Sequence, residues 1–402
     1  MFSLPGGVQV TSSPPLPTTV PTSTLPDEER GGVDNGPGVV TTLLRYGTDT
    51  RYTLRRRTTI GSAADRDIVI REPGVSSHHC RLEHKRGRLL VTDGRSKNGT
   101  FFEGERDNSF ILKPGKMFSA GPHGCQFLAL DDEMCTHYPA LAEILGLQQE
   151  HSLRSETPSP ADMILVACSG APLLIESEPH CEQHRLADIV HKISLFRARP
   201  FVELASEPSA VADTPSLLRK RARKATLVID LDSVKYPLDP TAVSMMFSSR
   251  YQVRVIALAR SVDIADEAFG NHARELHRIW LPPIANRPQE VGRLLDRMFI
   301  DEDSPLRMSL FTPENERALL SYSWPENFLA LRQAATWLTA VARAGSVNQA
   351  AVDLGDLGPK RSTLQNWYKG RVGLSHPLVP DVIGKAMLAA PPKSAIQKKR
   401  GS

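Results

Sequence analysis

Apolar positions recur with a different period in each stretch of the chain. Residues 1–36 are mostly Pro, Ser, Thr and Gly with little apolar periodicity. Such a segment buries too little surface to offset the entropy lost on ordering, so we expect a disordered N-terminal segment. Residues 37–132 instead carry short alternating runs, such as VVTTLLRY, HCRLEH and RLLVTD, separated by turn residues. Strands of this length at regular spacing predict a small antiparallel all-β sandwich.

A rhythm of strand and then helix follows. A helical-looking stretch and the Pro-bearing ETPSP predict a linker at 133–160. Within 161–300 the runs MILVACS, PLLIES, FVELA, ATLVIDLD and VRVIALAR are rich in Val, Ile and Leu, as buried parallel strands are. Helical patterns such as CEQHRLADIVHKI lie between these runs. The stretch therefore predicts an α/β core with helices on both faces of its sheet.

The rest of the chain is predicted to be helical, up to a basic tail. Residues 301–344 predict a helical lid, and 345–376 predict two short helices of a small all-α module. Residues 377–402 end in PPKSAIQKKRGS, which has cations and no acid, as flexible basic tails do. The fold class is therefore multidomain, with a β-sandwich, an α/β core with a helical lid, and a small all-α end.

Composition narrows the class of protein. A chain of 402 residues, at about 150 residues per domain, predicts two or three domains. The formal net charge of +4 and the pI near 8.8 are compatible with a nucleic-acid partner. Five cysteines without a C-x-x-C pair indicate reduced intracellular thiols rather than a disulfide framework or a zinc site. The sequence has no apolar run of about 18 residues and no secretion signal at its start. We expect a cytoplasmic protein without a membrane partner.

The sandwich region carries three spaced motifs. Gly61 follows an early predicted strand, Ser76 and His79 form a Ser-x-x-His motif, and Asn98, Gly99 and Thr100 form an Asn-Gly-Thr motif. With this spacing the region resembles the forkhead-associated (FHA) domain over about 90 residues. The resemblance implies an eleven-stranded sandwich whose loops bind phosphothreonine peptides. It also implies structural roles for Gly61, His79, Gly99 and Thr100.

The residue chemistry supports an anion site and also shows a gap in it. A phosphate needs several converging donors, and Ser76 supplies a hydroxyl while Asn98 supplies an amide that clamps the peptide backbone. The family's arginine after Gly61 is Ser62 here, and the basic residue that often follows the binding serine is Ser77. The loss of a guanidinium costs about 1.5–3 kcal/mol unless another cation replaces it. The available replacements are Arg66, His78, Arg95 and Lys97. The alternatives are that Ser76 and Asn98 only cap turns, or that the module binds an unphosphorylated protein.

The α/β region resembles the AAA+ activators of sigma-54 RNA polymerase, the bacterial enhancer-binding proteins. The resemblance rests on LLIESEPHCEQHRLADIVHKISLFRARPF, ATLVIDLDSVKYPLDPTAV, VRVIALARSVD, LPPIANRPQEV and SYSWPENFLALR, which occur in the family's order. A phosphate-cradling loop needs G-x-x-x-x-G-K-[ST]. Other residues occupy the implied nucleotide site: Ser177, His180 and Glu182 replace glycines, Gln183 the lysine, His184 the hydroxyl, Leu231 the water-orienting glutamate and Leu329 the lid arginine, while Asp230 is retained.

These replacements predict a degenerate nucleotide site with no catalytic residue and no cofactor. The GAFTGA-like loop with which the family touches the sigma factor is also missing between 201 and 230, where the basic run LLRKRARK lies. A metal pair formed by His180 and His184, or paired carboxylates formed by Asp230 and Asp232, would be alternatives. The degenerate phosphate loop explains the segment better, so we expect no metal site.

The segment AGSVNQAAVDLGDLGPKRSTLQNWYKGRVGL resembles the Fis-type helix-turn-helix, although its turn, GDLGPK, is longer than usual. The second helix would be a recognition helix that enters a major groove. Its candidate DNA-binding residues are Lys360, Arg361, Thr363, Gln365, Asn366 and Lys369. The alternative is the polar face of a helical bundle.

Together these features predict a bacterial transcription regulator. The FHA-like module would dock a phosphothreonine-bearing or other protein partner, the core would be a scaffold and an oligomerisation surface, and the last helices would bind DNA. One alternative is a signalling adaptor that never contacts DNA, which salt-dependent retention on DNA would distinguish. The other is an active ATPase with unusual residues.

Overall fold

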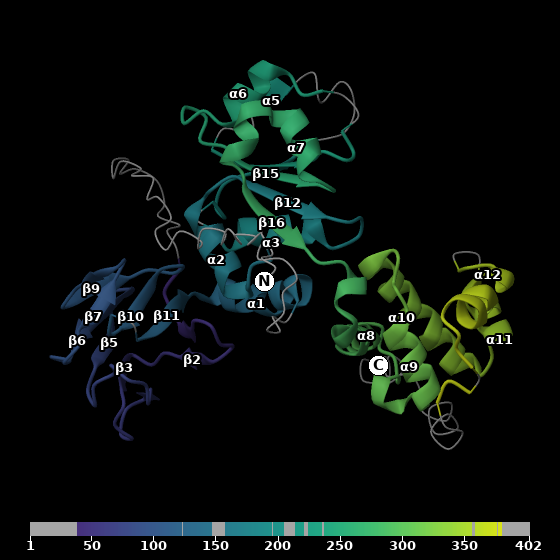
Figure 1. Cartoon of the computed structure of the whole chain (residues 1–402), viewed down its shortest axis with the longest axis horizontal. Coiled ribbons are helices and arrows are strands. Elements are labelled where there is room, and N and C mark those ends of the chain that lie inside the picture. Colours follow the sequence, from purple (N-terminus) through teal and green to yellow (C-terminus); the bar gives the residue numbers. More distant parts are fainter. Residues whose placement is uncertain are drawn as a thin grey trace, which may run out of the picture. The chain divides into compact units, whose positions relative to one another are not determined.

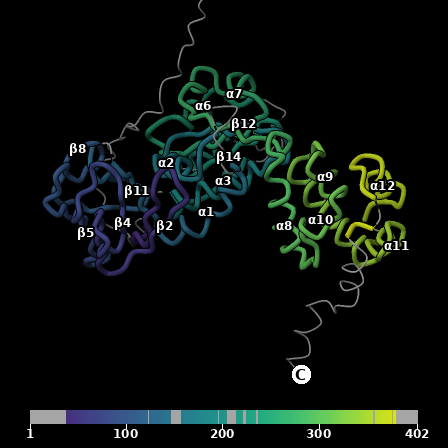
Figure 2. The backbone as a smooth tube through the Cα atoms, turned by 60° about the horizontal axis from the view of Figure 1, so that its bottom comes forward, coloured from purple at the N-terminus to yellow at the C-terminus, as the bar shows by residue number. Residues whose placement is uncertain are grey.

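The computed structural model describes residues 38–122, 124–146, 157–194, 196–204, 214–220, 224–234, 237–355, 358–375 and 377–379. The expected N-terminal disorder at 1–36, the centre of the basic run and nearly all of the basic tail lie outside these residues. The chain divides into two compact units (Figures 1 and 2). One contains Met1–Glu133 and Leu165–Ser169, and the other contains Met134–Ile164 and Gly170–Ser402. Each unit is described by itself.

The first unit is an all-β sandwich of two sheets, as the alternating runs predict. One sheet has the order β2-β1-β11-β10-β7-β8 and the other the order β4-β3-β5-β6-β9. The strands of the first are β1 (Thr42–Arg45), β2 (Arg51–Thr53), β7 (Thr100–Phe102), β8 (Glu105–Arg106), β10 (Met117–Ala120) and β11 (Cys125–Leu130). Those of the second are β3 (Arg57–Gly61), β4 (Ile68–Val69), β5 (Cys80–Lys85), β6 (Arg88–Asp93) and β9 (Ser109–Leu112). All these strand pairs are antiparallel except β3 with β4.

Alternation along the strands produces the core of this sandwich. In β5 and β6 the buried positions include Leu82, Leu89 and Val91, and the residues between them are exposed or half-buried. Phe118 and Phe127 stack with their ring centroids 5.2 Å apart in the same cluster. Because successive side chains point to opposite faces of a strand, this period holds the register and leaves the loops at the strand ends free to carry a site.

Two helices occupy the stretch between the sandwich and the α/β sheet. Helix α1 (Asp132–Leu145) lies in the first half of the predicted linker at 133–160 and buries an apolar stripe that includes Tyr138 and Leu141. Helix α2 (Pro160–Ser169) contains MILVACS, which was predicted to be a strand, and that prediction is wrong. Ser159 caps the helix in a capping box with Asp162, and Pro160 stands at the first helical position. These start signals outweigh an apolar run that is compatible with either structure.

The second unit contains a five-stranded parallel sheet with the order β13-β14-β15-β12-β16. Its strands are β12 (Leu173–Ser177), β13 (Phe201–Glu203), β14 (Thr226–Asp230), β15 (Arg254–Ala259) and β16 (His277–Leu281). Four of them were expected from their apolar runs. Strand β16 was not, because it lies at an edge and only two of its five residues are buried. Edge strands lack the continuous apolar run of central ones.

Helices cover both faces of this sheet (Figure 1). They are α3 (Gln183–Lys192), α5 (Thr214–Lys220), α6 (Pro240–Met246), α7 (Val262–Phe269) and the short 3-10 turn η1 (Gly270–Glu275). Two further 3-10 turns, η2 (Ile284–Asn286) and η3 (Pro288–Glu290), follow β16 and pack with the helices after them. Helices α5, α6 and α7 share one apolar cluster with Leu227 and Ile229 of β14. Helix α3 covers the other face, where His191 and the hydroxyl of Thr226 lie 2.9 Å apart and hydrogen-bond. The α/β layer therefore has the expected two-sided arrangement.

The remaining described residues form helices around one core. They are α8 (Val291–Asp301), η4 (Met308–Leu310), α9 (Pro313–Ser321), α10 (Asn327–Ala344), α11 (Val347–Asp353) and α12 (Arg361–Gln365), which continues as a π-turn, η6 (Asn366–Arg371). The expected lid at 301–344 and the expected DNA-binding module at 345–376 contribute to a single apolar cluster, for example through Leu331 and Tyr368. Buried Asn315 of α9 donates to the carbonyl oxygen of Ser375 at 3.0 Å. The last helices are thus packed against α9 and α10.

Across the described part of the chain, every helix is too short or too polar to cross a bilayer.

Candidate functional site

The sandwich places its first motif where two loops meet. Strand β3 ends at Gly61, and the next two amides donate to the other loop, from Ser62 to the Ser76 carbonyl at 3.0 Å and from Ala63 to the Ser77 carbonyl at 3.3 Å. A Cβ at Gly61 would lie 2.1 Å from the Ser77 carbonyl oxygen. Only glycine permits this approach of two backbones. The close approach holds Ser62 beside Ser76.

His79 joins this loop to the Asn-Gly-Thr loop from inside the sandwich. Its ring is fully buried, and its Nδ1 accepts the backbone N–H of Ser76 at 3.1 Å. Nε2 must therefore carry the hydrogen and donate to the carbonyl oxygen of Gly99, 3.1 Å away. Burial lowers the pKa of His79, so the neutral ring that this network needs is favoured. His79 has no free atom for a ligand and braces both loops.

The Asn-Gly-Thr loop is fixed by short polar contacts. The Asn98 amide donates to the Gly74 carbonyl at 2.9 Å, and Thr100 is fully buried with its hydroxyl 2.7 Å from Asp93. Although burial raises the pKa of Asp93, hydrogen bonds from Ser96 and Thr100 lower it below the usual value. Asp93 therefore stays a carboxylate and holds the turn. Gly99 has φ +86°, in the left-handed region that glycine tolerates.

Ser76 is ready to donate a hydrogen bond out of the loops. Its Oγ accepts the backbone N–H of Lys97 at 3.0 Å, and within the described residues its hydroxyl hydrogen has no acceptor. The Oδ1 atom of Asn98 likewise has no donor there, while its amide is held by Gly74. A hydroxyl donor and an amide carbonyl thus lie on adjoining loops, as binding of a phosphorylated peptide requires.

The cations near these loops differ in availability. Arg66 is paired with Asp65 through two hydrogen bonds, one of them with Nε and Oδ1 3.0 Å apart, so its charge is already neutralised. Arg95 and Lys97 are exposed, and neither has an ion-pair partner among the described residues. Lys97 is also tied to Ser76 through its own amide. Arg95 and Lys97, which belong to the loop bonded to Ser76, are therefore the available replacements for the missing guanidinium. His78 and Ser77 are exposed as well.

The α/β sheet carries the second predicted site at the carboxyl end of β12. The loop from Glu178 to Glu182 leads into α3, and Ser177 is buried at its start. His180 and Glu182, which stand where the resemblance expects glycines, have φ +62° and +66°. Such a backbone costs a side chain about 1–2 kcal/mol per residue. The loop thus keeps a glycine-type path without the glycines.

Helix α10 supports this strained loop. The Phe328 amide donates to the His180 carbonyl at 3.1 Å, and the Asn327 side chain donates to the Pro179 carbonyl at 3.0 Å. Asn327 is buried and also accepts the amide of Ile284 at 2.9 Å. Surrounding structure of this kind is what a left-handed residue needs to persist.

The Glu182 carboxylate, at the residue before α3, is held by two arginines. Arg332 donates to it at 2.6 Å and Arg185 at 3.4 Å, and the Glu182 side chain is only 10% exposed. The Glu182 side chain makes no capping hydrogen bond, so the arginines and not the helix amides satisfy the carboxylate. Leu329, where the resemblance expects an arginine, brings no charge. Arg332 was not among the site residues predicted from the sequence, although it lies three residues after Leu329 and so on the same helix side.

His184 and Asp230 form the other ionic contact of this site. His184 Nε2 lies 3.4 Å from Asp230 Oδ2, which also accepts the Ser233 hydroxyl at 2.7 Å. The contact raises the pKa of His184 and lowers that of Asp230. Leu231 is buried in the core, and Gln183 begins α3 without a charge to replace lysine. The described residues contain no group of three or more possible metal ligands.

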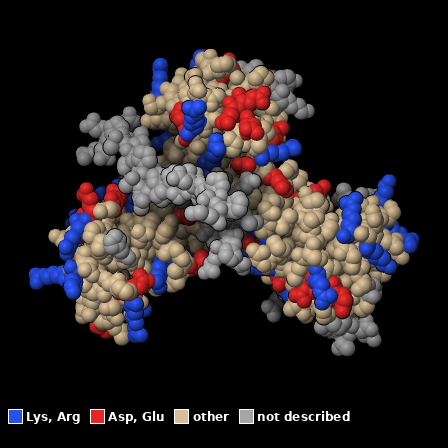
Figure 3. All heavy atoms as spheres, in the orientation of Figure 1, with Lys and Arg blue, Asp and Glu red and all other residues tan. Residues whose placement is uncertain are grey.

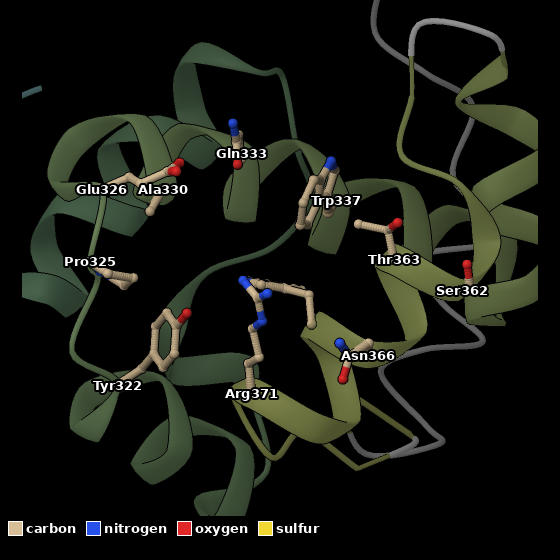
Figure 4. Close-up of a pocket in the computed structure, with 11 residues that line it drawn as sticks. Tyr322, Pro325, Glu326, Ala330, Gln333, Trp337, Ser362, Thr363, Asn366 and Arg371 are labelled. Atoms are coloured by element: carbon tan, nitrogen blue, oxygen red, sulfur yellow. The ribbon is translucent and has the colours of Figure 1, made fainter.

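The predicted recognition helix exposes all six candidate residues, but on two sides. Thr363 and Asn366 line a groove of about 770 Å³ between this helix and α10 (Figure 4). The other four, Lys360, Arg361, Gln365 and Lys369, are exposed and do not line it. Arg361 Nε donates to Asn348 of α11 at 2.7 Å, and Leu364 is buried beneath them. The candidate DNA-binding face is therefore divided.

Comparisons with known proteins identify the sandwich. Residues 58–121 match the family model of the FHA domain. The ABC transporter ATP-binding/permease protein Rv1747 of Mycobacterium tuberculosis is 36% identical over 108 residues, which are 26% of this chain and 12% of that protein. The chain thus spans a small part of this relative's length.

Two solved structures are similar over a comparable share of the chain. Mycobacterium tuberculosis EmbR in complex with a low-affinity phosphopeptide is 26% identical, covers 23% of this chain and 24% of its own, and has a TM-score of 0.22. FHA-1 of Rv1747 from the same organism is 20% identical, covers 24% of this chain and 99% of its own, and has a TM-score of 0.21.

Proposed function

Because the chain carries an FHA domain at residues 58–121, we propose that it is a regulatory protein that binds a phosphothreonine-bearing partner through this module. In this proposal the α/β core is a scaffold that does not hydrolyse nucleotide, and the last helix contacts DNA. The observation that carries the proposal is the free hydroxyl hydrogen of Ser76 beside the held amide of Asn98.

Charge decides how strongly the phosphate would bind. The phosphate carries nearly two negative charges, and the family's arginine is Ser62 here. Lys97 and Arg95, both exposed and unpaired within the described residues, are the cations that compensate. A charged hydrogen bond contributes about 1.5–3 kcal/mol, so one of them suffices to offset the missing guanidinium.

Titration calorimetry on the full chain tests this proposal. A library of phosphothreonine peptides should contain sequences that bind at least about tenfold tighter than their unphosphorylated forms. Ser76→Ala and Lys97→Ala should remove most of that difference, whereas Ser109→Ala, at an exposed position of strand β9, should not. Equal, weak binding of every phosphorylated and unphosphorylated pair would end the phosphate assignment in favour of an unphosphorylated partner.

The scaffold assignment is supported by the charges at the loop after β12. Glu182 is negative where a nucleotide phosphate would need donors, and it is satisfied by Arg332. His184 stands where the resemblance expects a metal-binding hydroxyl, and its ring pairs with the carboxylate of Asp230. Phosphate release from ATP and Mg²⁺ should therefore stay at the rate of buffer. Release above that rate, and lost in Asp230→Asn, would make the chain an ATPase.

DNA binding is a second candidate function, favoured by the stripe of Arg361, Gln365 and Lys369. These side chains are exposed, occur at every fourth residue along α12 and η6, and lie outside the groove. Retention of the full chain on duplex DNA should fall steeply with salt, since phosphate contacts release counterions. Lys369→Ala should lower the salt slope by about 1, and the surface control Arg274→Ala should leave it unchanged. Retention that changes neither with salt concentration nor in Lys369→Ala would favour an adaptor that does not bind DNA.

A further inference from the structure

A groove lies between α10 and the C-terminal helix, and most of its lining has no role in either proposed activity (Figure 4). Its volume of about 770 Å³ lies in the range of small-molecule sites. All of its lining residues belong to the helical part of one unit, whose helices share a single core. Its walls are therefore held in place by packing on both sides. In the space-filling view of Figure 3, lysine and arginine side chains gather over the α11 and α12 region.

Aromatic side chains provide flat walls. Trp337 of α10 and Trp367 of η6 meet edge to face, with ring centroids 5.0 Å apart. Trp367 is 7% exposed and rigidly packed, while Trp337 is half-buried. Tyr322 lines the groove as well and packs edge to face on buried Trp324, with centroids 5.0 Å apart. Such surfaces bind planar rings by stacking.

Several polar side chains that line the groove are available to bind a ligand. The side chains of Arg371, Glu326, Gln333, Asn366 and Thr363 all line it. Within the described residues none of the five has a hydrogen-bond or ion-pair partner, and the two opposite charges do not pair with each other. Figure 4 shows the guanidinium of Arg371 directed into the space between the two walls. A cation, an anion and two amides thus surround an aromatic surface.

We propose that this groove binds an adenine nucleotide. Arg371 binds the phosphate, for which a guanidinium is the best side chain. The indoles of Trp337 and Trp367 contact the base, and the amides of Gln333 or Asn366 pair with the N6 and N7 edge that distinguishes adenine. Glu326 accepts the ribose hydroxyls, the role that a carboxylate has in dinucleotide sites.

Competing ligand classes leave part of the lining unused. An inorganic anion pairs with Arg371 but leaves the aromatic surface exposed to water and the side-chain amides without hydrogen-bond partners. An apolar ligand covers Trp337 but buries the charges of Arg371 and Glu326 without partners, which costs free energy. Only a ligand with an anion, a planar ring with donors and acceptors, and hydroxyl groups matches every group. The site is separate from the loop after β12, where Glu182 already supplies the anion.

Titration calorimetry of the full chain with AMP, adenosine and inorganic phosphate tests the proposal. AMP should bind in a saturable manner, adenosine about tenfold more weakly, and phosphate alone about a hundredfold more weakly. Quenching of tryptophan fluorescence should accompany AMP binding, because two of the four tryptophans line the groove. No saturable AMP binding up to about 5 mM would overturn the proposal, since the affinity would then be negligible.

Variants locate the binding. Arg371→Gln should reduce AMP affinity to that of adenosine, and Asn366→Ala should weaken AMP and adenosine alike, by about fivefold or more. Both residues are exposed, so the fold should survive, and the melting temperature checks this. Arg317→Gln, at an exposed position of α9 outside the groove, should leave AMP binding unchanged. An equal loss in Arg317→Gln, or AMP binding that persists unchanged in Arg371→Gln, would refute the assignment. Arg371-dependent binding of a single-stranded oligonucleotide without binding of AMP would also refute it.

Discussion

The ion pair between Glu182 and Arg332 offers the sharpest test of how this core is held together. Glu182 has two opposed effects on stability, because its carboxylate binds Arg332 at 2.6 Å while its backbone has φ +66°. Truncation to alanine removes the ion pair and keeps the strain. Truncation to glycine removes both. The two substitutions therefore separate electrostatics from backbone conformation at one position.

The magnitudes follow from exposure and geometry. A charged hydrogen bond contributes about 1.5–3 kcal/mol when buried. The Arg332 side chain is 50% exposed, however, so solvent screening reduces the expected value to about 1 kcal/mol. A left-handed backbone costs about 1–2 kcal/mol for a residue with a Cβ, of which glycine's extra unfolded-state entropy returns part. Glu182→Ala should thus lose about 1 kcal/mol, and Glu182→Gly should be about 1 kcal/mol more stable than Glu182→Ala.

Denaturant unfolding of the full chain, followed by tryptophan fluorescence, measures these differences. Trp324 is 1% exposed in the core that includes α10, so its emission reports on the relevant unit. A double-mutant cycle with Arg332→Ala should give a coupling energy of about 0.5–1.5 kcal/mol. A coupling below about 0.3 kcal/mol would refute the ion pair as a support. Equal stability of Glu182→Ala and Glu182→Gly would refute the strain.

Three further expectations follow from single contacts. Asp230 raises the pKa of His184, so their contact stabilises the fold fully below about pH 6.5 and is lost as pH rises through the pKa of the folded state. His184→Asn should therefore flatten the change in unfolding free energy between about pH 6 and 8. Gly61→Ala should disrupt the phosphopeptide loops, since the added Cβ meets the Ser77 carbonyl at 2.1 Å, and peptide titration should show lost binding. Asn315→Ala should destabilise the C-terminal helices by about 2–4 kcal/mol in denaturant unfolding, because three carbonyl oxygens lose their shared donor and the Ser375 amide loses its acceptor.

The sandwich was predictable because its signals are local and spaced. Gly61 and the Asn98 turn each impose a backbone path that few residues allow, so motif and geometry coincide. Alternation along β5 and β6 supplied the strands, since one face of each sheet is buried. The sequence also showed that an arginine is missing at Ser62. It did not show which cation could replace it, because the loop conformation decides which cations are already paired.

The α/β core was predicted in outline and missed in detail. MILVACS is helical because Ser159 and Asp162 cap it, a signal that was present in the sequence and outranked the apolar run. The contact of Glu182 with Arg332 joins residues far apart in the chain, so no local pattern specifies it. The same holds for the groove, where Trp337 and Trp367 come from different helices. Tertiary packing decides such contacts.

The divided surface of the last helix links the two proposals made for it. Asn366 lines the groove, and one amide forms a two-pronged pair with a nucleotide or with a base in DNA, but not with both. If both proposals hold, occupation of the groove would lower DNA affinity by the contributions of Asn366 and Thr363, of which the two-pronged amide accounts for about 1–3 kcal/mol. Lys369 lies outside the groove, so its phosphate contact and the salt dependence of DNA binding persist. Because linkage is reciprocal, DNA must weaken nucleotide binding by the same factor. The groove would thus tune sequence selection while general affinity for DNA is retained.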